Sequence, residues 1–181
     1  MLGFSGISHA GFIILGLLTM EATGYGRAIY YIAGYVIMNL ACFLVICNVS
    51  QKGENLVVED LNGLHTRHPV LAFILAVGLF ALAGIPPFVG FMGKFMLLTA
   101  ALEKGYLVLV ILAAFNTAIA IYYYLSVVRA AYTTDPEDRP AINVDYFTQA
   151  VGVILVLMII IMGALPSKII AFAGSAVQTI M

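Results

Sequence analysis

The sequence predicts an all-α, polytopic transmembrane helix bundle. Of its 181 residues, 63% are hydrophobic and only 9% are charged, whereas about 25% of the residues in an ordinary soluble domain are charged. Several apolar stretches reach the length of about 20 residues that a helix needs to cross a bilayer. One such stretch is interrupted by GIPP at 84–87, which predicts a proline-broken helix. We therefore expect a single membrane domain over residues 1–181, with the lipid bilayer around it.

The membrane spans follow from apolar runs that are separated by polar or glycine-containing segments. They are expected at about residues 3–20, 28–49, 70–84 with 88–101, 106–128 and 146–165. Residues 50–69 and the segment TTDPEDRP are the expected polar loops, and the residues after Pro166 are expected to form an amphipathic or partly buried tail. Lysine and arginine divide almost evenly between the two sides, so charge bias does not set the orientation. Whether the broken segment crosses once or twice is also left open.

The break lies between 70–84 and 88–101. Pro86 and Pro87 cannot donate backbone hydrogen bonds, and Gly84 adds conformational freedom. Backbone N–H and C=O groups that leave the helix at membrane depth need hydrogen-bond partners from protein or water. A polar cavity is therefore expected beside the break.

Lys94 is the main candidate functional residue because it is the only charged residue between positions 70 and 101. A lysine at the bilayer centre costs about 2.5–3.5 kcal/mol on insertion scales, so it persists where it faces protein or water. Gly90 and Gly93 flank it and allow close approach of another backbone or of water, which favours a functional intramembrane lysine. The alternative is a membrane anchor whose side chain extends to the headgroups.

His9 is the second candidate, because an imidazole can both donate and accept a proton near neutral pH. Its alternative role is a packing histidine that is hydrogen-bonded to a neighbour. Other side chains could line a polar path: Ser5, Ser8, Asn116, Tyr122, Tyr123 and Tyr124. The three tyrosines are equally typical of an interfacial aromatic belt.

Several classes of function are excluded by what the sequence contains. The net charge is −1 and there is no basic run, so nucleic-acid binding is not expected. His65 and His68 lack further ligands at metal-binding spacing, and the two cysteines suit neither a disulfide framework nor a metal site. No catalytic acid pair, activated nucleophile or cofactor ligand set is present, so we expect no redox chemistry in this chain itself.

Four motifs resemble a known family. FSGISHAGF, EDLNGLHTRHPVLA, LAGIPPFVGFMGKF and AIYYYLSVV, in this order, resemble the subunit N family of bacterial proton-pumping NADH-quinone oxidoreductase, respiratory complex I. The motifs fall within residues 4–129. Family members are antiporter-like, with inverted-topology repeats and a broken helix in each repeat. The resemblance implies that this chain is the C-terminal portion of a larger subunit, with the C-terminal half of that fold.

The resemblance also implies a function. Lys94 takes the place of a lysine that is held to be a proton-channel residue, and His9 lies near the link between the proton paths of the two repeats. The chain would then be a subunit of a multi-pass translocase in the bacterial inner membrane, with the other membrane subunits, including the antiporter-like ones, as partners. NADH, FMN, iron–sulfur clusters and quinone would be bound by partner subunits. The alternative is a subunit of a multi-subunit sodium/proton antiporter.

Overall fold

The computed structural model describes residues 1–50, 56–133 and 141–180. Within these ranges it is all-helical, as the sequence predicts. The eight α-helices and one 3-10 helix of the described ranges are α1 (Leu2–Leu17), α2 (Ala22–Val49), η1 (Val58–Leu61), α3 (Leu64–Arg67), α4 (Pro69–Ala83), α5 (Val89–Glu103), α6 (Leu107–Thr133), α7 (Tyr146–Ala164) and α8 (Pro166–Ile180).

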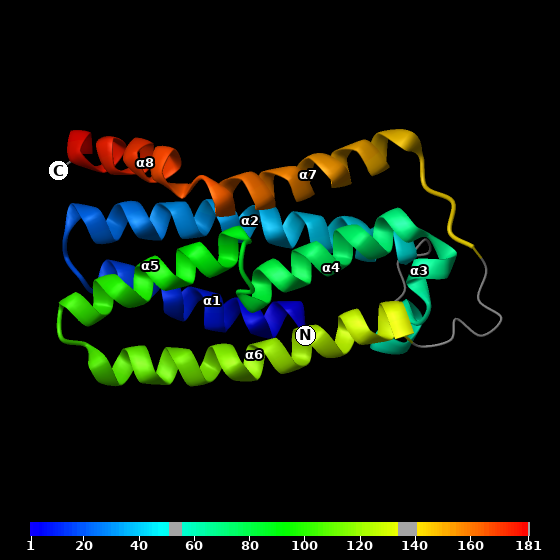
Figure 1. The fold of residues 1–181 in the computed structure, drawn as a ribbon, viewed down its shortest axis with the longest axis horizontal. Helices are drawn as coiled ribbons and strands as arrows, with labels where there is room; N and C mark the ends of the chain where they lie inside the picture. The colour runs from blue at the N-terminus through cyan, green and yellow to red at the C-terminus, as the bar shows by residue number, and fades with distance from the viewer. Residues whose placement is uncertain (51–55, 134–140, 181) are drawn as a thin grey trace.

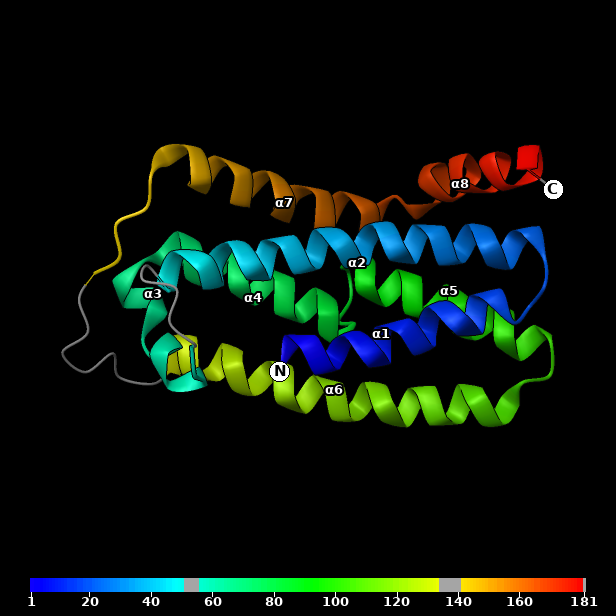
Figure 2. The same ribbon diagram turned by 180° about the vertical axis from the view of Figure 1, so that it is seen from behind.

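The helices form an elongated bundle whose long axis follows α2 (Figure 1). One end holds the α1–α2 turn, the α5–α6 turn and the C-terminal end of α8, and the other holds η1, α3 and the start of α7 (Figures 1 and 2). Helix α2 packs against α1, α4, α5, α7 and α8, so it is the central element of the bundle. By length and composition, α2, α6 and α7 can each cross a membrane, while α1 and α4 are shorter apolar helices.

The broken segment crosses the bundle once. Helix α4 runs from the α3 end to the middle, and α5 continues in the same direction to the α5–α6 turn, so the two half-length helices together run beside α2 (Figures 1 and 2). Helix α4 begins with Pro69 in its first turn and with His68 as N-cap, whose side chain accepts a hydrogen bond from Leu71 N. It ends at Gly84, whose φ of 87° is the left-handed conformation that glycine adopts without strain.

A second interruption separates α7 from α8 at Pro166, where the sequence predicted the end of the last span. Helix α8 continues in the direction of α7 and packs along α2, so the expected tail is a helix of 15 residues (Figure 1). Pro166 cannot donate to the carbonyl of Met162, which lies one helical turn earlier. The hydroxyl of Tyr30 donates to that carbonyl at 2.7 Å and so replaces the missing amide.

The two interruptions pack against each other. A Cβ atom added to Gly163 would lie 2.6 Å from the carbonyl carbon of Phe88 and 2.7 Å from the nitrogen of Val89, so only glycine fits this approach. The α7–α8 break therefore lies directly on the start of α5.

Two helix boundaries differ most from the expected spans. Helix α2 begins at Ala22 rather than at 28, and Gly24 in its first turn lies against Gly16 of α1, so these glycines serve close helix packing rather than a long turn. Helix α6 extends to Thr133 rather than to 128, because its last turns pack under η1 and α3 and accept a hydrogen bond from Gly63 N to Ala130 O. The remainder of the TTDPEDRP loop, 134–140, lies outside the described residues.

Candidate functional site

Two backbone carbonyls at the end of α4 lack helical donors. In an α-helix, the carbonyl of residue i accepts a hydrogen bond from the N–H of residue i+4. For Leu82 and Ala83, both of those later positions are proline, so neither amide hydrogen exists. The Nζ atom of Lys94 donates to both carbonyls, at 2.8 Å to Leu82 and 3.2 Å to Ala83. Lys94 thus replaces the two amides that the prolines remove.

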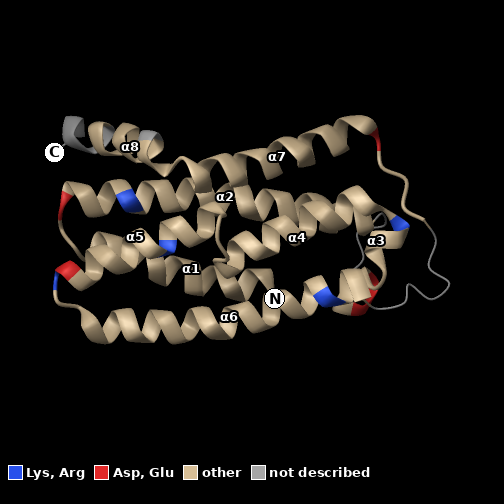
Figure 3. Cartoon of the chain, viewed as in Figure 1, with Lys and Arg blue, Asp and Glu red and all other residues tan. Residues whose placement is uncertain are grey.

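The environment of Lys94 is apolar apart from this helix end. Its side chain is 5% exposed, so it does not extend to the surface as the anchor alternative requires. The C-terminal end of a helix carries partial negative charge, which attracts the ammonium group. Most other charged residues lie toward the two ends of the bundle (Figure 3), but Arg27 of α2 donates to the carbonyl of Met96, two positions after Lys94 in α5. Two ion pairs, Arg27 with Glu103 and Glu21 with Lys104, connect the N-terminal part of α2 and the residue before it with the end of α5.

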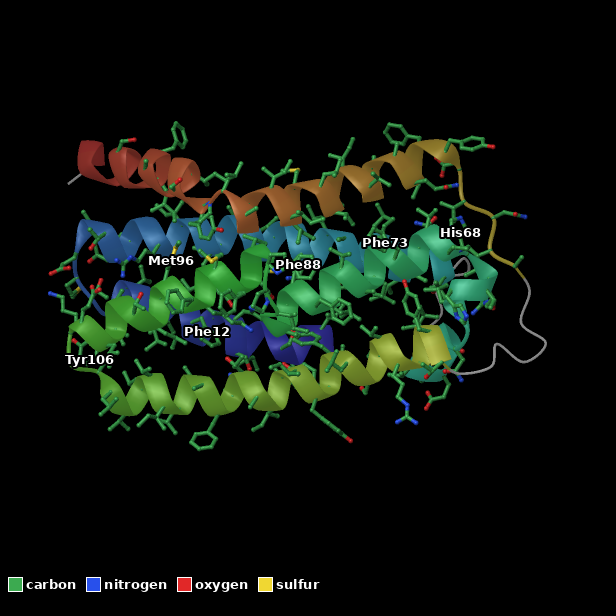
Figure 4. All side chains as sticks on the ribbon, viewed as in Figure 1. Phe12, His68, Phe73, Phe88, Met96 and Tyr106 are labelled. Atoms are coloured by element: carbon green, nitrogen blue, oxygen red, sulfur yellow. The ribbon has the colours of Figure 1, made fainter. Side chains whose placement is uncertain are left out.

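The ring of Phe12 covers Lys94 on the side of α1. Nζ lies over this ring at 5.3 Å from its centroid, a distance at which a cation is attracted to an aromatic face. Phe12 is itself 3% exposed and packs with Leu97 and Ala101 of α5. Figure 4 labels it on α1, inside the bundle.

His9 lies at the centre of a second polar group formed by tyrosines. Its Nδ1 atom is 2.7 Å from the hydroxyl of Tyr31, and its Nε2 atom is 3.3 Å from the hydroxyl of Tyr124. The imidazole stacks on Tyr35 with 4.6 Å between the ring centroids. Because a tyrosine hydroxyl can donate or accept, both neutral tautomers of His9 can be accommodated. We call these four residues, His9, Tyr31, Tyr35 and Tyr124, the His9 cluster.

Tyr31 connects the His9 cluster with the helix that carries Lys94. Its ring packs on Gly93, where an added Cβ would lie 2.5 Å from Cδ2 of Tyr31. The same ring lies 6.0 Å from that of Phe12, measured between centroids. The two polar groups are thus neighbours, and Phe12 and Tyr31 lie at the boundary between them.

The other polar residues singled out from the sequence fall into separate places. Ser8 donates to Asn116 at 3.4 Å, and Ser5 donates to the carbonyl of Leu2. Tyr124 belongs to the His9 cluster, and Tyr123 is partly buried with its ring against Tyr124. Tyr122 is 79% exposed on the outer face of α6 and does not join them, because consecutive helical positions point about 100° apart.

The sequence interpretation missed Tyr31, Tyr35 and Phe12. A signal was present for the tyrosines, because Tyr31 and Tyr35 are four positions apart within an apolar span and so share one helix face. Their buried hydroxyl groups need partners. For Phe12 the sequence contains no comparable signal, because an aromatic residue in an apolar span is ordinary packing.

His65 and His68 have different neighbours, although they lie in one motif. His65 stacks on Tyr132, and its Nδ1 atom lies 3.1 Å from the carbonyl oxygen of Ala131, whereas His68 caps α4. The imidazole of His65 therefore joins α3 to α6, whereas that of His68 caps the first turn of α4. Among the described residues no group of three or more potential metal ligands is found.

The all-helical bundle with its broken helix has the fold of the antiporter-like membrane subunits. Solved structures share this fold. A chain of respiratory complex I from Thermus thermophilus matches with a TM-score of 0.83 and 28% identity, covering 94% of this chain and 38% of that chain. A chain of the Mrp complex from Dietzia sp. matches with a TM-score of 0.82 and 20% identity, which shows the fold alone, over 97% of this chain and 41% of that chain.

The sequence comparisons are more specific. Residues 1–120 match the family described as "NADH:quinone oxidoreductase/Mrp antiporter, TM", and the chain belongs to this family. It is 48% identical to NADH-quinone oxidoreductase subunit N 2 of Opitutus terrae, over 99% of this chain and 38% of the relative. It is 46% identical to the subunit N 2 of Solidesulfovibrio magneticus, over 97% of this chain and 38% of the relative. The resemblance to subunit N is thereby confirmed, and the chain spans less than two-fifths of the length of these relatives.

Proposed function

We propose that this chain is part of a subunit N of a proton-translocating NADH-quinone oxidoreductase, in which Lys94 is an intramembrane proton site. The observation that carries the proposal is the pair of hydrogen bonds from Nζ of Lys94 to the carbonyls of Leu82 and Ala83 at the helix break. Among the described residues, Nζ of Lys94 is hydrogen-bonded to backbone alone, and no carboxylate is paired with it to fix its charge. It can therefore gain and lose a proton without breaking an ion pair.

The stereochemistry of the amine fits this role. An ammonium group has three N–H donors, and a neutral amine has two donors and one lone pair. Lys94 can therefore keep both carbonyl bonds in either state. Only the third position on Nζ changes, so proton binding and release leave the helix break intact.

The His9 cluster supplies the next proton-carrying group in the proposal. His9 can receive a proton on one ring nitrogen and release one from the other, since both nitrogens face a tyrosine hydroxyl. Ser5, Ser8 and Asn116 would extend a polar path on the α1 and α6 side. We place NADH, FMN, iron–sulfur clusters and quinone in partner subunits, so that electron transfer there drives the proton steps here.

The assignment to a quinone reductase rather than to a sodium/proton antiporter rests on the relatives. Proteins that are 48% and 46% identical over nearly the whole chain are named subunit N of NADH-quinone oxidoreductase, whereas the likeness to the Mrp complex is one of fold. The bacterial relatives support a multi-pass location in the inner membrane, beside the other antiporter-like subunits. We also propose that the chain corresponds to the C-terminal repeat of the inverted-repeat fold.

The test uses the full-length subunit in the purified complex, reconstituted in vesicles. Proton uptake and NADH oxidation are measured together for Lys94→Ala, with Lys104→Ala as the control that removes an exposed lysine just beyond the same helix. We expect Lys94→Ala to lose most coupled pumping and Lys104→Ala to keep it. Pumping by Lys94→Ala at the wild-type rate and stoichiometry would refute the role of Lys94. Sodium-driven proton exchange by a complex that does not oxidise NADH would instead support the antiporter alternative.

A further inference from the structure

The proposed function leaves open what controls access to the third position on Nζ of Lys94. Two of its tetrahedral positions are directed to the carbonyls of Leu82 and Ala83. The ring of Phe12 lies over the nitrogen, and both side chains are buried. The exchangeable proton therefore lies in a site that an aromatic ring closes on the α1 side.

Phe12 also contacts the other polar group. Its ring lies 6.0 Å from that of Tyr31, and the hydroxyl of Tyr31 is bonded to Nδ1 of His9. Phe12 and His9 are three positions apart on α1, which puts them on one face of the helix. Phe12 thus has Lys94 as one neighbour and the His9 cluster as another.

A phenyl ring cannot relay a proton, because it has neither an exchangeable hydrogen nor a lone pair. Its face attracts a cation but not a neutral amine. In this conformation the ring attracts the charged form of Lys94, and it lies beside both the amine and Tyr31 of the His9 cluster.

From this arrangement we propose that Phe12 is a gate between Lys94 and the His9 cluster, an inference that rests on the proposed function of Lys94. When the ring turns away, a water molecule can enter between the two groups. The N–H bond at the third position of Nζ then breaks, its electron pair stays on nitrogen as the lone pair, and the proton passes to the water and on to the Tyr31–His9 pair. When the ring returns, the path is closed and back-flow is prevented.

The gate predicts a leak when the ring is removed. In vesicles that contain the full-length complex without NADH, an imposed potential should drive proton uptake several-fold faster through Phe12→Ala than through the wild type. Phe95→Ala is the matched control, because Phe95 is on the same helix as Lys94 but is 54% exposed on its outer face. The leak should disappear in the double variant Phe12→Ala/Lys94→Ala, because it passes through the amine.

Each result has a definite meaning. If Phe12→Ala leaks protons no faster than Phe95→Ala and pumps with wild-type stoichiometry, Phe12 is not a gate. That result leaves the proposed role of Lys94 intact. A leak that persists in the double variant indicates a packing defect and also overturns the gate. If Lys94→Ala alone pumps normally, the proposed function itself fails.

A second variant covers the case in which Phe12→Ala does not assemble. Phe12→Leu nearly conserves the volume, so the path stays closed, but it removes the aromatic face that holds the charged amine. We expect no leak from Phe12→Leu, together with a change in the pH profile of coupled pumping relative to Phe95→Leu. An unchanged pH profile would contradict the contact between the ring and the amine.

Discussion

Lys94 donates to the carbonyls of Leu82 and Ala83, the two acceptors whose helical donors are removed by prolines. The same relationship occurs a second time in the fold, where the hydroxyl of Tyr30 donates to the carbonyl of Met162, one turn before Pro166. At each break, a side chain from another part of the chain replaces the amides that proline lacks. An unsatisfied carbonyl inside a bilayer costs several kcal/mol, which explains why both sites are filled.

Gly84→Ala tests how strongly Lys94 depends on the break. Gly84 has a φ of 87°, and an added Cβ would lie 3.2 Å from Cδ and 3.3 Å from Nζ of Lys94. Left-handed backbone costs a residue with a Cβ about 1–2 kcal/mol. We expect a loss of stability of that size together with a several-fold loss of coupled pumping, measured by thermal unfolding and by proton uptake in the reconstituted complex.

Gly105→Ala is the control for this variant. Gly105 has a similar φ of 81°, but nothing lies within 4 Å of an added Cβ. It should show the same backbone strain and unchanged pumping. An equal loss of pumping in both variants would mean that backbone strain, and not displacement of Lys94, causes the defect.

Tyr30→Phe removes the donor to the carbonyl of Met162 while keeping the ring. We expect the complex to lose about 1–3 kcal/mol of stability, the cost of leaving a buried acceptor unsatisfied. Thermal unfolding of the purified complex in detergent measures the change in stability. Tyr122→Phe, on the exposed outer face of α6, should be neutral. Equal stability of the two variants would contradict the importance of the Tyr30 hydroxyl.

Gly163→Ala tests the contact between the two breaks. The added methyl group would overlap the backbone at Phe88 and Val89, so α7 or the start of α5 must shift. Overpacking of this kind costs about 1–3 kcal/mol. Gly11→Ala is the control, since nothing lies within 4 Å of its added Cβ and alanine favours the helix. If Gly163→Ala unfolds at the same temperature as the wild type, close contact between the two breaks is not needed for stability.

Glu21 and Lys104 join the two turns at one end of the bundle. The hydrogen bond and the charge of Lys104 hold the pKa of Glu21 below its usual value. The pair therefore stabilises the fold fully when the pH is above the usual pKa of a glutamate. This stabilisation is lost as the pH falls through the lowered pKa. Glu21→Gln should therefore lower the melting temperature slightly at neutral pH and have no effect in acid. The difference should also shrink at high salt, because the pair is exposed. A difference that grows as the pH falls would contradict the pairing.

Composition and the prolines determined much of the fold. The apolar runs predict a membrane bundle, and the two prolines at 86 and 87 predict both the break and two unsatisfied carbonyls, because a proline has no amide hydrogen wherever it lies. Lys94 could be singled out for the same local reason, as a charge within an apolar stretch. The start of α2 and the end of α6 were less predictable, because they depend on helix packing at Gly24 and beneath η1.

Only the tertiary structure decided which groups meet. Lys94 lies 12 positions from Leu82, and His9 lies 115 positions from Tyr124, so neither hydrogen bond is encoded in local spacing. The single crossing of the broken segment, the approach of the two breaks at Gly163 and the position of Phe12 over Lys94 all depend on how α1, α4, α5 and α7 pack around α2. Periodicity places residues on a helix face, but the choice of the facing helix comes from three-dimensional packing, which a single sequence leaves open.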